Sequence, residues 1–333
     1  MPQPTLVTAL LNIGRSRTHI RFRRSWKSYT SSLQRLAQLN LPMHIYAESE
    51  MHAQILKWRR GKPTVLHSLN AAMLRETDGF ARIQALRQSA NWLAQADWLP
   101  YSPMADLELY IPLVMSKLHW LAQAAEHGTS DDQYIWIDAG IHMHLWPGEH
   151  RIINEDYFTS LVRKSDKVRL FAKPYESNNE VHGFERSALA QFCNTDFVDR
   201  CCKGGVFGGS AAAIKLLAGC FNTTLMQTLS SQQLGTEESI LTILSYRHPE
   251  LTDVSLLPNT SVASLFNPHK PLLNLRRLRH PRSSMNSLKQ KSLRWWKQVL
   301  RPNKAADILS QSQVAYVAKD NFDLHILLCA RDL

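Results

Sequence analysis

One acidic residue, Asp138, directly follows a run of four large apolar residues, YIWI at residues 134–137. Such a run is typical of a buried strand, and open α/β sheets bind ligands beside the carboxyl ends of their strands. A carboxylate at that place can hold a hard divalent cation, which in turn can neutralise a diphosphate leaving group. The plainer alternative is an aspartate that only caps a helix or closes a turn.

A second candidate is the glycine-rich segment KGGVFGGS at residues 203–210, which precedes a helical pattern at 211–229. Glycines let the backbone approach a ligand closely, and free N–H groups at the start of a helix attract anions. The spacing matches neither a P-loop nor a GxGxxG motif. We predict a glycine-rich turn that either contacts an anionic ligand or only joins a strand to a helix, with Gly204, Gly205, Gly208 and Gly209 as its glycines.

Two adjacent acids, Glu237 and Glu238, follow Thr236 in a segment that predicts a helix over residues 236–246. Thr236 is suited to cap that helix, and acids in a first helical turn are ordinary because they complement the helix dipole. Carboxylates at such a place can also exchange protons with a substrate or stabilise a cation. The acids alone do not decide between these two roles.

The elements that must position these residues alternate between strand and helix. An apolar strand at 6–11, a helical pattern at 26–39 and a strand at 43–47 open the chain. This order predicts an α/β fold with a mainly parallel sheet. Later patterns predict helices at 78–96 and 112–125 and a strand at 167–171.

Five segments, taken in order, resemble the bacterial HtrL/YibB family, which is associated with lipopolysaccharide or other surface-glycan loci. The resemblance covers roughly residues 5–265 and implies a GT-A-like fold, a mixed and mainly parallel sheet flanked by helices. It also implies a glycosyltransferase of the hexosyltransferase type that uses a nucleotide-sugar donor. The segments are TLVTALLNIGR at 5–15, YIPLVMSK at 110–117, YIWIDAGIH at 134–142, GGVFGGSAAAI at 204–214 and TEESIL at 236–241.

A more distant similarity, to retaining glycosyltransferases of the ABO blood-group type, suggests individual roles. Asp138 matches the first aspartate of that family's metal motif, and the glycine segment matches the lining of its sugar site. Glu238 matches the catalytic glutamate, and Glu237 beside it is the second catalytic candidate. The resemblance implies that the donor lies near the strand ends, against Asn12, Gly14, Arg15, Lys117, Asp138, Gly140 and the four glycines.

The sequence departs from that family at Gly140, where a second metal-binding aspartate is expected. His142 is one possible replacement, which would make Asp138 and His142 the ligands of a manganese or magnesium ion. The other alternative is a site without metal in which Arg15 and Lys117 meet the diphosphate. Both alternatives stay open at this point, as does the choice between a retaining and an inverting reaction.

The net charge of +11 lies mostly in one segment. Residues 271–304 contain ten Lys or Arg and no acid, and they interleave with Trp295 and Trp296 in a predicted amphipathic helix at 285–300. We therefore divide the chain into a catalytic domain at 1–266 and a basic C-terminal extension at 267–333. The extension is suited to an anionic membrane surface near a glycan or lipid-linked acceptor, whereas nucleic acid is an unlikely partner.

The location expected from the sequence is cytoplasmic, with peripheral binding to the inner membrane as an option. The chain has no run of 18 apolar residues and no signal-peptide pattern, and its five cysteines show no regular spacing. Two rival hypotheses remain. One is a catalytically inactive GT-A-like protein that binds or scaffolds, and the other is a membrane-surface binder that acts through its basic extension.

Overall fold

The computed structural model describes residues 3–126, 128–144, 153–161, 166–175, 180–181, 183–257 and 273–274. All of them belong to one unit, Met1–Leu275. The basic extension at 267–333, apart from residues 273–274, lies outside the described residues. The proposed boundary at 266 and the amphipathic helix at 285–300 therefore stay predictions.

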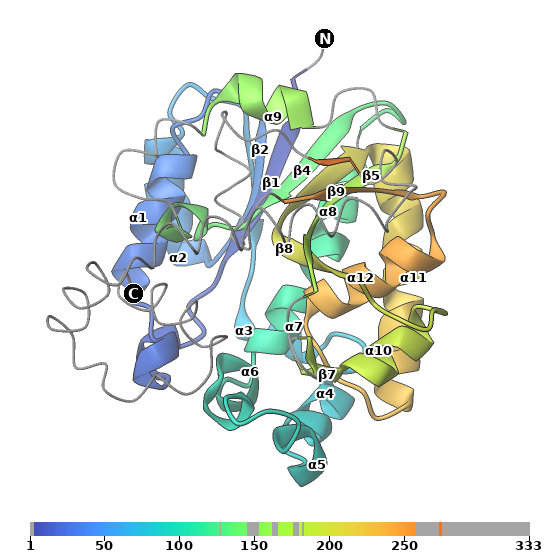
Figure 1. Cartoon of the computed structure of the whole chain (residues 1–333). Helices are drawn as coiled ribbons and strands as arrows, with labels where there is room; N and C mark the ends of the chain where they lie inside the picture. The colour runs from blue at the N-terminus through green and yellow to red at the C-terminus, as the bar shows by residue number, and fades with distance from the viewer. Residues whose placement is uncertain are drawn as a thin grey trace, which may run out of the picture. The chain divides into compact units, whose positions relative to one another are not determined.

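The described residues form a mixed sheet of eight strands in the order β10-β9-β5-β8-β4-β1-β2-β3 (Figure 1). The four strands β3, β2, β1 and β4 are parallel, β8 runs against β4 and β5, and β5 and β9 are parallel. This confirms the predicted fold class. The strand bounds are β1 Thr5–Leu10, β2 Met43–Ala47, β3 Thr64–Ser68, β4 Gln133–Ile137, β5 Val168–Pro174, β8 Arg200–Ser210, β9 Thr252–Leu256 and β10 Leu273–Asn274; β6 Glu180–Val181 pairs with β7 Phe184–Glu185 in a separate hairpin.

The first strands are buried on both faces, which explains their nearly continuous apolar sequences. Successive residues of β1 point to opposite sides, so that Val7 belongs to one buried core and Leu6 to the other. In the same way Trp136 and Ile137 of β4 enter different cores. The sheet is therefore the middle layer of three, and its register pairs Val7 with Trp136.

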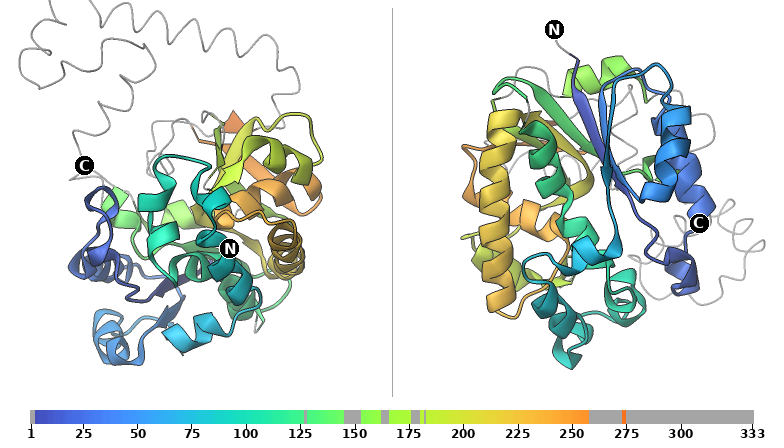
Figure 2. Two further views of the ribbon diagram at one scale, coloured as in Figure 1. Left: turned by 90° about the horizontal axis from the view of Figure 1, so that it is seen from below. Right: turned by 180° about the vertical axis from the view of Figure 1, so that it is seen from behind.

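Helices cover both faces of this sheet (Figure 2). The helices α1 Trp26–Leu36, α2 Ser49–Trp58 and α9 Glu155–Leu161 share a core with one face. The helices α8 Lys117–Ala125, α11 Ala211–Ser230 and α12 Glu237–Arg247 pack on the other. Shorter helices are α3 Ala71–Arg75, α4 Phe80–Arg87, α5 Ala90–Leu93, α6 Pro103–Asp106, α7 Tyr110–Met115 and α10 Arg186–Phe192.

Two predicted helices are each divided in the structure. Residues 78–96 form α4 and α5, because the Ser89 side chain accepts a hydrogen bond from the Trp92 N–H and starts a new helix. Residues 112–125 contain the end of α7 and all of α8, which meet at Ser116. The Ser116 hydroxyl donates to the Pro112 carbonyl at 2.8 Å, a bond that commonly bends a helix.

The prediction of a glycine-rich turn at 203–210 is wrong, because these residues belong to β8, which lies between β4 and β5. Glycine is needed there for close backbone packing: a Cβ on Gly208 would lie 2.3 Å from the Tyr134 carbonyl oxygen, and one on Gly209 would lie 2.4 Å from that of Lys167. The helix predicted after this segment is confirmed as α11, capped by the Ser210 side chain.

Among the described helices, none combines the length and the hydropathy needed to cross a bilayer. The four cysteines that the structure describes, Cys193, Cys201, Cys202 and Cys220, are free thiols.

Candidate functional site

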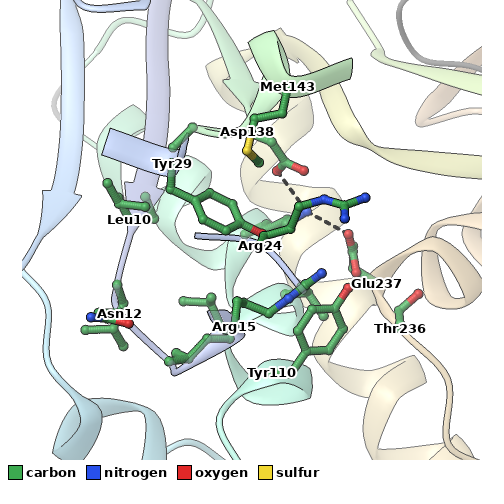
Figure 3. A pocket seen from close by; sticks show the side chains of 18 of the residues that line it. Leu10, Asn12, Arg15, Arg24, Tyr29, Tyr110, Asp138, Met143, Thr236 and Glu237 are labelled. Carbon is green, nitrogen blue, oxygen red and sulfur yellow. Dashed lines mark hydrogen bonds and ion pairs between the residues drawn. The ribbon is translucent and has the colours of Figure 1, made fainter. Parts of the chain in front are cut away.

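A cavity of about 310 Å³ opens where β1 and β4 end (Figure 3). Because these strands are parallel neighbours, the residues that follow them meet at one edge of the sheet. Segments from the helical layers complete the lining: residues near α1, α7 and α8, and the first turn of α12. The polar and charged lining residues are Asn12, Arg15, Ser16, Arg24, Tyr29, Tyr110, Lys117, Asp138, His144, Thr236, Glu237 and Glu238.

Lys117 links two of the acids in this cavity. Its ammonium nitrogen lies 2.8 Å from Oδ1 of Asp138 and 2.7 Å from Oε1 of Glu237. It also donates to the Gly204 carbonyl at 3.2 Å. Lys117 is the first residue of α8 and only 7% exposed. Burial lowers the pKa of this lysine, but Asp138 and Glu237 raise it by more, so that the net shift is upward and the ammonium stays charged.

Asp138 is held in place by three further contacts. The indole Nε1 of Trp136 donates to Asp138 Oδ1 at 2.8 Å, and the Asp138 backbone N–H donates to the Gly205 carbonyl at 2.9 Å. The Ile141 N–H donates back to the Asp138 carbonyl, which closes the turn after β4. These bonds orient the carboxylate toward the cavity and toward Lys117.

Glu238 forms an ion pair with a different lysine, Lys203. Lys203 of β8 lies 2.9 Å from Oε2 of Glu238, and the Gly204 N–H donates to Oε1 at 3.0 Å. Burial lowers the pKa of Lys203, but Glu238 and, to a smaller extent, other neighbouring groups together raise it by more. The glycine segment therefore serves the site through its backbone, because β8 brings Lys203 and Gly204 against the first turn of α12.

Glu237 is the most buried acid of the site, with 5% of its surface exposed. Burial raises its pKa, Lys117 lowers it, and Glu238 and Asp138 raise it again, for a net shift upward. The two directions at Glu237 and Lys117 agree physically, since one ammonium cannot fully compensate two carboxylates. Glu237 therefore takes up a proton more readily than an ordinary glutamate.

Two arginines, Arg15 and Arg24, carry the remaining positive charge of the cavity. The Arg15 guanidinium lies 5.2 Å from the Tyr110 ring centroid, and its Nη2 donates to the Phe22 carbonyl at 3.1 Å. Arg24 donates to the Arg23 carbonyl. Neither forms an ion pair with a carboxylate of the described residues, and Figure 3 shows both side chains reaching into the space beside Asp138 and Glu237.

Gly14 positions Arg15, because its left-handed backbone (φ 82°) starts the short helix η1 Arg15–Arg17. The Gly14 N–H donates to the Asn12 side-chain oxygen at 3.2 Å. Gly14 itself does not line the cavity, whereas Asn12 and Arg15 do.

Gly140 lines the cavity directly under an aromatic side chain. A Cβ at this position would lie 2.7 Å from Met143 Cε and 3.0 Å from Tyr29 Cε1. The Tyr29 ring and the Met143 methyl group thus occupy the room that an aspartate would need. Burial raises the pKa of the Tyr29 hydroxyl, so it acts as a neutral group.

Several residues expected from the sequence come together here. Asn12, Arg15, Lys117, Asp138, Gly140, Glu237 and Glu238 all line the cavity. The cavity lining does not include Gly204, Gly205, Gly208 or Gly209. Two of these glycines nevertheless contact lining residues: the Gly204 carbonyl accepts a hydrogen bond from Lys117, and the Gly205 carbonyl accepts one from the Asp138 backbone N–H. His142 is also absent from the lining: it is buried, and its backbone N–H donates to the Ser32 hydroxyl.

The sequence predicts no role in the cavity for Arg24, Tyr29, Tyr110, Trp136, Thr236 or Lys203. The arginine-rich stretch after the first strand was a usable signal for Arg24, since five arginines in residues 15–24 follow a strand end directly. Tyr29 and Tyr110 gave no such signal, because helical spacing alone presents them as core residues.

The predicted manganese or magnesium ion at Asp138 and His142 stays a prediction, and the residues present do not fit it. Lys117 already occupies the space between Asp138 and Glu237, and His142 is buried and does not line the cavity. No group of three or more His, Cys, Asp or Glu in the described part of the chain is arranged to hold a metal.

Comparison with known proteins gives a family and a weak structural likeness. No curated protein matches the chain. Among solved structures, mouse xyloside xylosyltransferase 1 in its apo form matches at 12% identity, over 75% of this chain and 84% of that one, with a TM-score of 0.38. The family model HtrL_YibB, described as a bacterial protein of unknown function, matches residues 2–257, and the chain belongs to this family.

Proposed function

We propose that this protein is a glycosyltransferase that moves a sugar from a nucleotide-sugar donor to an acceptor hydroxyl. One observation carries the proposal: a single cavity at the strand ends sets two arginines without carboxylate partners among the described residues, Arg15 and Arg24, beside three carboxylates. The positive groups suit a diphosphate, and the negative groups suit the cationic sugar carbon that forms when the diphosphate leaves.

The two arginines would hold the diphosphate. Guanidinium groups bind phosphate oxygens through paired hydrogen bonds, and Arg15 has a buried Nε without a partner in the described structure. Charge that develops on the departing diphosphate is stabilised by donors already in place, which is commonly the largest catalytic contribution. The nucleoside would lie toward the end of β1, where Leu10, Leu11 and Ile13 offer an apolar surface and Asn12 an amide.

The acids of α12 would act on the sugar. The bond between the sugar carbon and the diphosphate oxygen breaks, and its electron pair leaves with the diphosphate. The acceptor oxygen bonds to that carbon, and its proton passes to a carboxylate. Glu238 suits this role because Lys203 and the Gly204 N–H hold its carboxylate at the cavity wall. Glu237, beside it, is tied to Lys117.

The proposed acceptor is a surface glycan or a lipid-linked precursor of one. The resemblance of the sequence to a family associated with surface-glycan loci supports this acceptor. The basic segment at 271–304 would in addition favour binding to an anionic membrane surface on the cytoplasmic side. An inactive binding protein is the second candidate, and the lysine partners of both glutamates are the observation that favours it.

Thermal unfolding of the full chain with UDP-, GDP-, CMP- and dTDP-sugars tests the proposal. A ligand that binds the native state raises Tm by mass action, so we expect a shift with one nucleotide class and none with the matching nucleoside that lacks phosphate. Release of free nucleotide from that donor then separates an enzyme from an inactive binder. If no nucleotide-sugar shifts Tm, the proposed function is wrong.

A further inference from the structure

The ammonium of Lys117 sits in a cage of three oxygen atoms. Oδ1 of Asp138, Oε1 of Glu237 and the Gly204 carbonyl oxygen lie 2.8, 2.7 and 3.2 Å from its nitrogen. A lysine ammonium has three hydrogens and therefore three hydrogen bonds to give. Each of them has an acceptor here, and two of the acceptors carry negative charge.

We infer that this oxygen cage is built for the ammonium of Lys117 in place of a divalent cation, so that the donor diphosphate is bound without metal through Arg15 and Arg24. The part of this inference that concerns the donor rests on the proposed function. The part that concerns the cage does not.

Both geometry and charge prevent a divalent cation from occupying the cage together with the Lys117 ammonium. Magnesium requires oxygen ligands at about 2.0–2.1 Å in an octahedron, whereas the cage oxygens are spaced for hydrogen bonds to nitrogen. A divalent cation would also meet a positive charge in direct contact with its ligands. Lys117 begins α8 and is only 7% exposed, so its ammonium is held in the cage and not in solvent.

In the described part of the chain, the positions expected to supply further metal ligands do not offer them here. Gly140 supplies no side chain, and Tyr29 and Met143 fill the space in which one would lie. His142 is buried against α1, where its N–H binds Ser32. Among the described residues, the further oxygens near Asp138 are those of Glu237 and Gly204, and the Lys117 ammonium already occupies them.

The charges of the cavity agree with a diphosphate held by arginine. Asp138, Glu237 and Lys117 together carry one net negative charge, and the pair of Glu238 with Lys203 carries none. Arg15 and Arg24 therefore leave the cavity with a positive balance. Lys117 has no spare hydrogen for phosphate, so it is a positioning residue that neutralises the acids rather than a group that touches the donor.

Manganese binding to the full chain tests the cage directly. Electron paramagnetic resonance of free Mn²⁺ should show no stoichiometric binding by the wild type. Lys117→Ala should open the cage and bind one Mn²⁺, and Asp138→Asn added to it should remove that binding. Lys203→Ala is the matched control, because it frees only one carboxylate and should gain no site. One Mn²⁺ bound by the wild type and lost in Asp138→Asn overturns the inference, whatever the variants do.

Binding of UDP, GDP, CDP and dTDP, measured by calorimetry in EDTA and then in Mn²⁺, tests the donor part. We expect the affinity for the preferred nucleotide to change less than about threefold between the two conditions. A tenfold or greater gain with Mn²⁺ overturns the inference. If none of the four nucleotides binds in either condition, the proposed function fails, while the manganese measurement still decides the nature of the cage.

Discussion

Glu238 at the start of α12 and Lys203 in the middle of β8 form a largely buried ion pair, with 2.9 Å between Oε2 and Nζ. The pair holds one carboxylate of the cavity in a fixed orientation. It also explains why the segment around Gly204 and Gly205 lies next to the acids without lining the cavity itself.

The first prediction concerns Glu238. Glu238→Gln keeps the size of the side chain and the bond from the Gly204 N–H but removes the negative charge. We expect the release of nucleotide from the donor to fall by about 10²–10⁴-fold, as for loss of a general base, with donor affinity nearly unchanged. Glu250→Gln, on an exposed turn, is the matched control and should keep full activity. Wild-type turnover in Glu238→Gln would remove Glu238 from the mechanism.

A second prediction compares the contributions of two arginines of η1, Arg15 and Arg17, to nucleotide binding. Arg15 lines the cavity, whereas Arg17 is exposed and does not. Arg15→Ala should weaken binding of the nucleoside diphosphate by about 10–100-fold, because a charge-assisted hydrogen bond to phosphate is lost. Arg17→Ala should leave the affinity unchanged. Titration calorimetry measures both, and equal losses in the two variants would mean that only the general positive field matters.

Part of this site could be read from the sequence, since local patterns specify strand ends. The apolar runs of β1, β2 and β4 are buried on both faces and stand out without any knowledge of the fold. Asp138 was found because it follows such a run. Its partner Lys117 was proposed only as a phosphate ligand. A contact between side chains of two different elements produces no periodic pattern in the sequence, so it could not be predicted.

Other features of the fold could not be predicted from the sequence, for physical reasons. The edge strand β3 is only partly buried and has a weak alternation of apolar and polar residues. β8 was taken for a turn because glycines suggest flexibility, whereas here Gly208 and Gly209 allow two neighbouring backbones to come close. The cavity residues Arg24 and Tyr29 depend on the path of the chain between β1 and α1, which no periodic pattern encodes.

The third prediction contrasts two glycines. Gly208→Ala places a Cβ 2.3 Å from the Tyr134 carbonyl oxygen in the middle of the sheet, and backbone atoms cannot yield as a flexible side chain would. We expect it to lower the free energy of unfolding by about 1–3 kcal/mol or more. Gly219→Ala in α11 meets nothing within 4 Å and should instead stabilise by about 0.5–1 kcal/mol. Urea unfolding compares them, and a loss in both variants would contradict the packing argument.

The fourth prediction uses the pH dependence of the buried acid. Lys117→Met removes the ammonium and leaves Glu237 in a buried position without its charged partner. Breaking a buried ion pair in this way costs about 3–5 kcal/mol at neutral pH. Lys215→Met, on the exposed side of α11, is the matched control and should change stability little.

The sign of the pH effect follows from the raised pKa of Glu237. Between the ordinary glutamate pKa of 4.5 and the higher folded value, the native chain binds more protons than the unfolded chain, so the free energy of unfolding falls as pH rises. Loss of Lys117 removes a group that lowers this pKa, so the decline should continue to higher pH in Lys117→Met. Urea unfolding at pH 5, 7 and 8.5 should therefore show the gap between the variant and the wild type widening with pH. A gap that is constant across this range would mean that Glu237 does not change its protonation there.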